Sequence, residues 1–411
     1  MSADNKVPEI RFKSFSGGWK NSELSELALF NPKSELPESF KYVDLESVKG
    51  TSLIGYKIES RNSAPSRAQR LAQKGDVFYQ TVRPYQKNNY LFHCVENDYV
   101  FSTGYAQLRP YFNGNFLLNL VQRDLFVKSV LNNCTGTSYP AINASTLATI
   151  GVSYPKNEAE QTQIGNYFQK LDALINQHQQ KHDKLSNIKK SMLEKMFPKQ
   201  GETIPEIRFK GFSGEWEEAS LLDSIERIID FRGRTPKKLG LDWSPSGYRA
   251  LSALNVKQGY IDFSIDPHFG DQELYDKWMS GSELHQGQVL FTTEAPMGNV
   301  AQVPNTDKYI LSQRTIAFIV KSEIVVEDFL AVLLRSSKVF RELSALSSGG
   351  TAKGVSQKVL ANLNVSIPTN LVEQTAIGNY FQKLDNLINQ HQQQITKLNN
   401  IKQACLSKMF V

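Results

Sequence analysis

The strongest constraint on the fold is that the sequence contains two copies of one unit. Residues 7–19 read VPEIRFKSFSGGW, and residues 204–216 read IPEIRFKGFSGEW. Farther along, residues 160–197 and 373–410 are identical at 28 of 38 positions. Chance does not produce two such matches in the same order. The chain is therefore an internal repeat, and both halves are expected to share one architecture.

Between these near-identical segments the two copies diverge but keep a common framework. GDVFYQTVRP at residues 75–84 corresponds to GQVLFTTEAP at residues 287–296, and YVFS at residues 99–102 corresponds to YILS at residues 309–312. A retained framework with changed surface residues is typical of modules that share a fold but recognise different things.

The modules are expected to be α+β. Residues 76–82, 289–293 and 309–320 are rich in β-branched and aromatic residues and are bounded by Gly, Pro or Asn, which predicts short strands. Residues 116–131 and their counterpart 329–343 show helical periodicity.

A long helix is predicted to follow each module. Asn157 and Asn370 are good N-cap residues, and Glu160 and Glu373 stand three positions later, where a glutamate can return a hydrogen bond to the cap. Pro198 stops the first helix. The expected division is a first module at 1–157, a first helix at 158–198, a linker at 199–203, a second module at 204–369 and a second helix at 370–411.

Both helices carry apolar residues at heptad spacing around a polar centre. An amphipathic helix can also lie on its own module, but the length of these two favours a coiled coil. We expect an antiparallel pair in which His178 lies opposite Gln394 and Lys181 opposite His391, so that histidine sets the register and binds no metal. The expected seam is Leu171, Leu174, His178, Lys181, Leu185, Leu384, Leu387, His391, Gln394 and Leu398.

Composition limits the class of protein. With 411 residues and 40% hydrophobic residues the chain can fill two or three cores, so it is not disordered. It has no signal peptide or membrane-spanning run, and its three cysteines form no CxxC pair. A soluble, cytoplasmic protein without a disulfide framework is expected.

Sequence motifs for catalysis are missing. We find no phosphate-binding loop, no GxGxxG, no HExxH and no GxSxG, and the histidines outside the seam form no ligand set. The nearest approach to the tetrapeptide of adenine methyltransferases is Asn31-Pro32-Lys33-Ser34, which lacks the second proline and the aromatic residue. The sequence therefore predicts neither catalytic residues nor a metal site.

The net positive charge of the chain weakly favours a polyanionic partner. The net charge is +6, but residues 204–368 hold 18 Lys and Arg against 20 Asp and Glu, so a DNA-binding face on the second module must be a local patch. FRGRTPKK at residues 231–238 offers such a patch, although a charge run is equally often a solvated loop.

In the first module, residues 83–89 combine a guanidinium, an aromatic ring and amides, the groups that pair with base edges; the other interpretation is an ordinary hairpin loop. The matching residues 292–299 contain Glu294 and Asn299 but no cation, so the two copies should not read the same bases. The candidate DNA-binding residues are Arg83, Tyr85, Lys87, Asn88, Thr137, Arg232, Arg234, Thr235, Lys237, Lys238, Thr292, Thr293 and Lys353.

Taken together, these segments resemble the specificity subunit of type I restriction-modification enzymes over the whole chain. The resemblance lies in the EIRFxxFxxxW opening of each half, the GDVxxxxxRP-like strand and turn, and the entry to each helix, here Ile367-Pro368 followed by Glu373-Gln374, Ile377-Gly378 and Leu384-Asp385. The first copy has Tyr154-Pro155 where the family usually has Ile-Pro.

The resemblance implies two target recognition domains, each reading one half of an asymmetric bipartite DNA site, separated by an antiparallel helical pair. It also implies that the helices dock two methyltransferase subunits and that restriction subunits join them. S-adenosylmethionine, ATP and Mg are then expected in those partners and not in this chain. Two alternatives are a coiled-coil scaffold whose modules bind proteins and, least favoured, a self-sufficient methyltransferase or nuclease.

Overall fold

The computed structural model describes residues 7–266, 268–347 and 354–411. The chain divides into two compact units, Met1–His178 with Gln393–Val411 (unit 1) and Gln179–Gln392 (unit 2). This division differs from the predicted one, because the boundary cuts through both long helices. Each unit thus combines one module with a segment of α4 (Glu158–Lys195) and a segment of α9 (Leu371–Lys408).

In unit 1, one sheet has the strand order β2-β11-β8-β9 and a second the order β6-β3-β10-β7, in which β10 runs parallel to β3. A short pair, β1 with β12, joins the two ends of the module. The strands are β1 (Lys20–Glu23), β2 (Ala28–Phe30), β3 (Ser39–Val43), β4 (Val48–Lys49), β5 (Ser52–Leu53), β6 (Lys57–Ser60), β7 (Ala68–Leu71), β8 (Val77–Gln80), β9 (Tyr90–Leu91), β10 (Tyr99–Ser102), β11 (Tyr105–Pro110) and β12 (Gly151–Tyr154). The helices are η1 (Leu24–Glu26), η2 (Pro84–Gln86), α1 (Gly114–Gln122), α2 (Asp124–Leu131) and α3 (Ala144–Ala148).

Unit 2 repeats this framework. Its sheet β14-β20-β17-β18 corresponds to β2-β11-β8-β9, the pair β13 with β21 corresponds to β1 with β12, and β15 runs parallel to β19 as β3 does to β10. The strands are β13 (Glu217–Ser220), β14 (Ile225–Asp230), β15 (Tyr248–Leu251), β16 (Phe269–Gly270), β17 (Val289–Thr292), β18 (Val300–Gln302), β19 (Tyr309–Leu311), β20 (Thr315–Val320) and β21 (Asn364–Ile367). The helices are η3 (Leu221–Ser224), η4 (Pro236–Leu239), α5 (Gln272–Met279), α6 (Glu327–Leu333), α7 (Ser337–Leu346) and α8 (Gln357–Ala361).

Several elements that the sequence predicts as continuous are interrupted. Residues 116–131 form α1 and α2 with a break at Arg123, whose backbone is extended and whose buried guanidinium donates to the Val411 carbonyl at 2.5 Å. Residues 309–320 form β19 and β20, which belong to different sheets and are separated at Arg314 by a left-handed residue (φ 65°). The pattern of apolar residues continues across both breaks, because the segments on either side of each break face the core. The sequence pattern therefore does not reveal the breaks.

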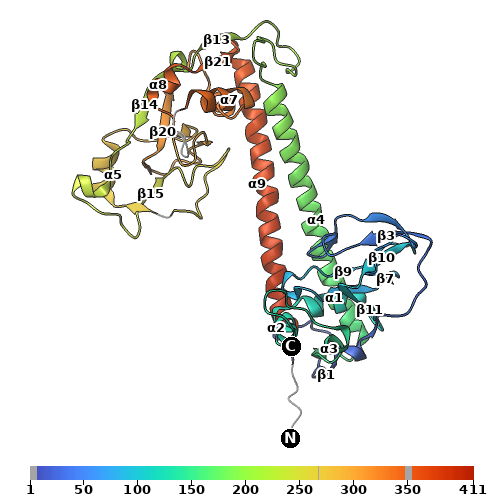
Figure 1. Ribbon diagram of the computed structural model, residues 1–411. Coiled ribbons are helices and arrows are strands. Elements are labelled where there is room, and N and C mark those ends of the chain that lie inside the picture. Colours follow the sequence, from blue (N-terminus) through green and yellow to red (C-terminus); the bar gives the residue numbers. More distant parts are fainter. Residues whose placement is uncertain (1–6, 267, 348–353) are drawn as a thin grey trace. The chain divides into compact units, whose positions relative to one another are not determined.

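Segments of α4 and α9 run side by side and antiparallel within each unit (Figure 1). In unit 1 the Tyr167 hydroxyl lies 3.7 Å from the Cys405 sulfur, the pair that the predicted register places opposite each other, and Lys402 is 2.5 Å from Asp172. In unit 2, Lys189 is 2.5 Å from Asp385. As residue numbers increase along α4, the numbers of their partners on α9 decrease, which shows that the two helices are antiparallel.

The middle of the seam differs from the prediction. Leu174 is 43% exposed, and Lys181 and Gln394 are also exposed, whereas Ile175 is half-buried and Ile395 is 7% exposed. In the middle of each helix, the residue one position farther along the chain is thus more buried than the predicted seam residue. The other predicted seam residues are buried or half-buried.

Each unit's core is completed by the end of the other repeat's helix. Phe410, which follows α9, packs in unit 1 with its ring centroid 5.9 Å from Trp19 and 5.6 Å from Phe116. Phe197, which follows α4, packs in unit 2 with its ring 5.8 Å from Trp216 and 6.0 Å from Phe329. The near-identical MF ends of the repeats are thus core residues.

Near their first turns the long helices also pack tightly against their modules through glycine. A Cβ atom at Gly165 would come within 2.9 Å of the Phe116 backbone nitrogen, and one at Gly378 within 2.9 Å of the Asp328 carbonyl carbon. Only glycine allows backbones to approach this closely. The IG pair in both helix entries therefore serves helix docking.

Candidate nucleic-acid interface

In unit 1, two loops meet at the end of β8. The backbone nitrogen of Arg83 donates to the Pro140 carbonyl at 2.8 Å, and the Arg83 guanidinium lies 4.4 Å from the centre of the Tyr139 ring. Tyr85 is 50% exposed and Tyr139 is 63% exposed. Thr137 is exposed in the second of these loops. The structure therefore joins the loops that carry Arg83, Tyr85 and Thr137, and their exposed side chains offer groups for stacking and hydrogen bonding to bases.

Lys87 and Asn88, in contrast, are engaged within the protein. Lys87 is ion-paired with Asp124, and the Asn88 side-chain oxygen accepts a hydrogen bond from the Gly50 nitrogen at 2.8 Å. Both partners are distant in sequence, so the local pattern did not indicate them. We correct the prediction for Lys87 accordingly: its charge is already compensated.

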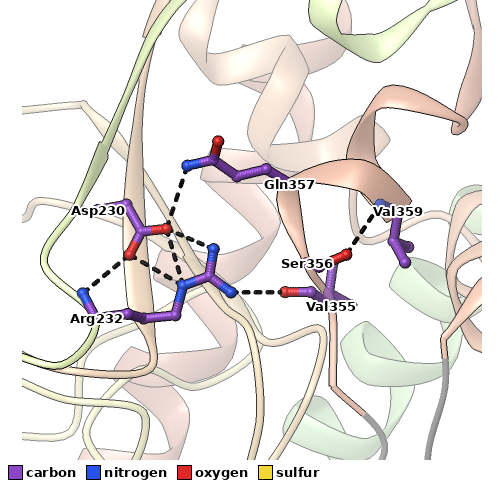
Figure 2. A network of polar contacts seen from close by, with 6 residues as sticks. All are labelled: Asp230, Arg232, Val355, Ser356, Gln357 and Val359. Carbon is purple, nitrogen blue, oxygen red and sulfur yellow. Dashed lines mark hydrogen bonds and ion pairs between the residues drawn. The ribbon is translucent and has the colours of Figure 1, made fainter.

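In unit 2, Arg232 is held by Asp230, the last residue of β14 (Figure 2). Its Nε lies 2.8 Å and its Nη2 2.5 Å from one carboxylate oxygen, and Nη1 donates to the Val355 carbonyl at 3.3 Å. Burial acts to raise the pKa of Asp230, but the hydrogen bonds and charge of Arg232 hold it below its ordinary value. Both side chains are therefore charged, and their opposite charges cancel within the pair.

The other residues of the basic loop have mixed roles. Arg234 is half-buried, with its guanidinium 4.3 Å from the centre of the Phe231 ring and hydrogen-bonded to the Trp278 carbonyl. Thr235 caps η4 by accepting from the Lys238 nitrogen at 3.2 Å, and Lys238 Nζ donates to the Gly233 carbonyl at 2.7 Å. Lys237 is exposed, and among the described residues no ion pair is recorded for it. The predicted cluster of cations facing DNA is thus mostly used to build the loop.

Thr292 and Thr293 do not reach the surface. Thr292, the last residue of the inner strand β17, is 0% exposed, and Thr293 just after it is 2% exposed. The Thr292 hydroxyl accepts from the Asn299 nitrogen at 2.8 Å. Their prediction as DNA-contacting residues is wrong in this structure. Lys353 lies outside the described residues.

A hollow in unit 2 was missed by the sequence analysis. It has a volume of about 400 Å³ and is lined by, among others, Trp243, Asp266, His268 and Arg314. His268 Nδ1 is 2.5 Å from Asp266, and its ring centroid lies 5.3 Å from that of Trp243. Asp266 and His268 are close in sequence, but Trp243 and Arg314 come from remote segments, so no local spacing joins all four. Exposed Tyr139, by contrast, could have been noted as an aromatic residue between Ser138 and Pro140.

The described residues also bear on a metal site and on a membrane span. No group of three or more His, Cys, Asp or Glu residues that could hold a metal ion occurs in the described part of the chain. Within the same residues, the helices include none with the length and apolar character that a membrane span needs.

Comparison with known proteins gives the family. The family described as type I restriction modification DNA specificity domain matches residues 17–187 and 215–400. The type I restriction enzyme MjaVIII specificity subunit of Methanocaldococcus jannaschii is 26% identical over 274 residues. That match covers 65% of this chain and 62% of the length of that protein.

One solved structure supports the fold. The S subunit of a type I restriction-modification system from M. genitalium matches with a TM-score of 0.62 at 12% identity, over 99% of each chain. The HsdS subunit from Thermoanaerobacter tengcongensis matches over 99% of this chain and 98% of that one, at 19% identity and a TM-score of 0.41. Because the family match occurs twice and covers most of the sequence, this chain belongs to the type I restriction-modification DNA specificity family.

Proposed function

We propose that the chain is the non-catalytic, sequence-reading subunit of a type I restriction-modification system. Each module reads one part of a bipartite, asymmetric target in double-stranded DNA, and the helical pair sets the separation of the two parts. The helices dock two methyltransferase subunits, which direct adenine-N6 methylation, and restriction subunits add ATP-dependent cleavage. S-adenosylmethionine, ATP and Mg bind to those partners. We also propose a cytoplasmic location.

One observation carries this proposal: equivalent loops on the shared framework present different side chains. The Ile142 nitrogen donates to the Thr81 carbonyl at 3.0 Å in unit 1, and the Val355 nitrogen donates to the Thr293 carbonyl at 2.8 Å in unit 2. At this common edge, unit 1 exposes Tyr139 beside Arg83, whereas unit 2 places the Arg232–Asp230 pair. A constant scaffold with variable loops suits the reading of two different sequences.

The decisive experiment exchanges one module. Residues 204–368 are replaced by the equivalent module of a relative, the hybrid is expressed with methyltransferase subunits, and methylated adenines are mapped across the genome. We expect one half of the methylated motif to change and the other to stay, because each module has its own core and its own loops. A change in both halves contradicts independent reading, and the absence of any motif contradicts the proposed function.

A protein-binding scaffold is the second candidate, and one observation favours it: the Lys87–Asp124 and Arg232–Asp230 pairs neutralise cations in both loops predicted to contact DNA. Salt dependence separates the two functions. DNA binding that neutralises phosphates weakens steeply as salt rises, whereas a largely apolar protein interface is far less sensitive. A flat salt dependence of binding to duplex DNA would favour the scaffold.

A further inference from the structure

We propose that Arg232 contacts a guanine in the half-site read by the second module, oriented for that contact by Asp230. This inference rests on the proposed function, because it assigns one base contact within it. It differs from the expectation drawn from the basic sequence run, in which Arg232 faces the phosphate backbone.

The hydrogen bonds of the guanidinium leave donors for a base (Figure 2). Of its five N–H groups, Nε and Nη2 each give one to Asp230, at 2.8 and 2.5 Å, and Nη1 gives one to the Val355 carbonyl at 3.3 Å. Within the described part of the chain, one N–H therefore remains free on each terminal nitrogen. The long hydrogen bond to the Val355 carbonyl is also the one most easily replaced by a hydrogen bond to a base. Guanine offers two neighbouring acceptors in the major groove, O6 and N7, which arginine pairs with bidentately.

The carboxylate that holds Arg232 is itself fixed. Asp230 pairs with Ile316 in the ladder between β14 and β20, its side chain is 11% exposed, and the amide of Gln357 donates to it at 3.4 Å. It also accepts from the backbone nitrogen of Arg232 at 3.0 Å. The arginine side chain is thus ordered before DNA arrives, although it remains 35% exposed, so little rotamer entropy is lost on contact.

The charge balance around Arg232 favours contact with a base over contact with a phosphate. A phosphate contact depends on unbalanced positive charge, and Asp230 cancels the charge of Arg232 at short range. The directional N–H donors survive this cancellation, and they are what a base edge requires. Lys237, five residues farther on, is exposed and has no ion pair within the described part of the chain, so it is the better phosphate-contacting group of this loop.

Lys237 therefore provides the matched control for the test. The full-length chain carrying Arg232→Ala, Arg232→Lys or Lys237→Ala is expressed with methyltransferase subunits, and methylated motifs and binding to duplexes with single base-pair changes are measured. For Arg232→Ala we expect preference at one G·C pair, in one half only, to fall by roughly 10- to 100-fold. Arg232→Lys, which keeps the charge but not the planar fork, should lose the same preference. Lys237→Ala should weaken all duplexes alike and reduce the salt slope by about one.

The outcomes are distinct. An unchanged motif with Arg232→Ala, a uniform weakening like that of Lys237→Ala, or a change in both halves would overturn the assignment to a base. Should Arg232→Ala fail to fold, as judged by circular dichroism, the Arg232→Lys variant decides by the same criteria. If the unmutated chain directs no sequence-specific methylation, the proposed function fails, and that result is separate from any result on Arg232.

Discussion

Two glutamates, one near the start of each long helix, carry their carboxylates into the protein interior. Glu160 and Glu373 are both 1% exposed, and each accepts two hydrogen bonds from an arginine near the start of its own repeat. The distances are 2.7 Å from Arg11 and 2.6 Å from Arg208. A buried charge is tolerated only when it is paired in this way. The arginine of each EIRF segment thus neutralises the buried carboxylate of its own repeat.

We predict that Arg11→Met destabilises unit 1 by about 3 kcal/mol, because it leaves the Glu160 carboxylate buried without its cation. The double variant Arg11→Met, Glu160→Leu should be more stable than the single one, since it removes both charges. Hydrogen exchange measured by mass spectrometry would locate the loss in unit 1, and Arg208→Met is the matched control, with its loss in unit 2. A single variant as stable as the unmutated chain would show that the ion pair contributes nothing.

The position of these glutamates also shows where local sequence patterns mislead. The pattern Asn-x-x-Glu predicts a capping box in both helices. Asn157 and Asn370 do cap, with their side-chain oxygens accepting from Ala159 and Val372 at 2.9 and 2.8 Å, but the glutamates turn to arginines about 150 residues away in sequence. A long-range ion pair in a buried site outweighs a local hydrogen bond that water can replace.

At the scale of elements, the two helices are joined by equivalent ion pairs in different surroundings. Asp172 with Lys402 in unit 1 corresponds to Asp385 with Lys189 in unit 2. Asp385 also accepts from Arg335 at 2.5 Å, whereas for Asp172 no second ion pair is recorded among the described residues. Burial, opposed by Asp385, lowers the pKa of Lys189 below its ordinary value.

We predict that Lys402→Met costs about 1 kcal/mol of unfolding free energy, and that Lys189→Met costs close to nothing. The first leaves Asp172 without its partner, while in the second Arg335 still compensates Asp385 and an unfavourably buried ammonium group is removed. Urea unfolding of the two single variants, followed by hydrogen exchange in each unit, measures the difference. Equal losses would mean that Arg335 does not compensate Asp385.

At the scale of the whole molecule, the repeat was the most informative property of the sequence. It predicted that both halves share one architecture, and Trp19 and Trp216, at equivalent positions of the two copies, do lie in equivalent cores. The loops were less predictable, since the partners of their cations come from remote segments: Asp124 for Lys87 and the Val355 carbonyl for Arg232. Charge content predicts a basic loop but does not say which cations are already paired.

The last prediction concerns the helical pair as a ruler, which is part of the proposed function. Inserting one heptad into the middle of both helices should lengthen the unread gap between the two half-sites. A heptad adds about 10 Å of helix, and DNA advances about 3.4 Å per base pair, so roughly three base pairs is the ceiling. Because each added base pair also rotates the duplex by about 35°, the second module must follow the groove, and only part of the lengthening is expected. Mapping methylated adenines measures the gap directly; an active insertion variant with the original gap would show that the helices are not the ruler.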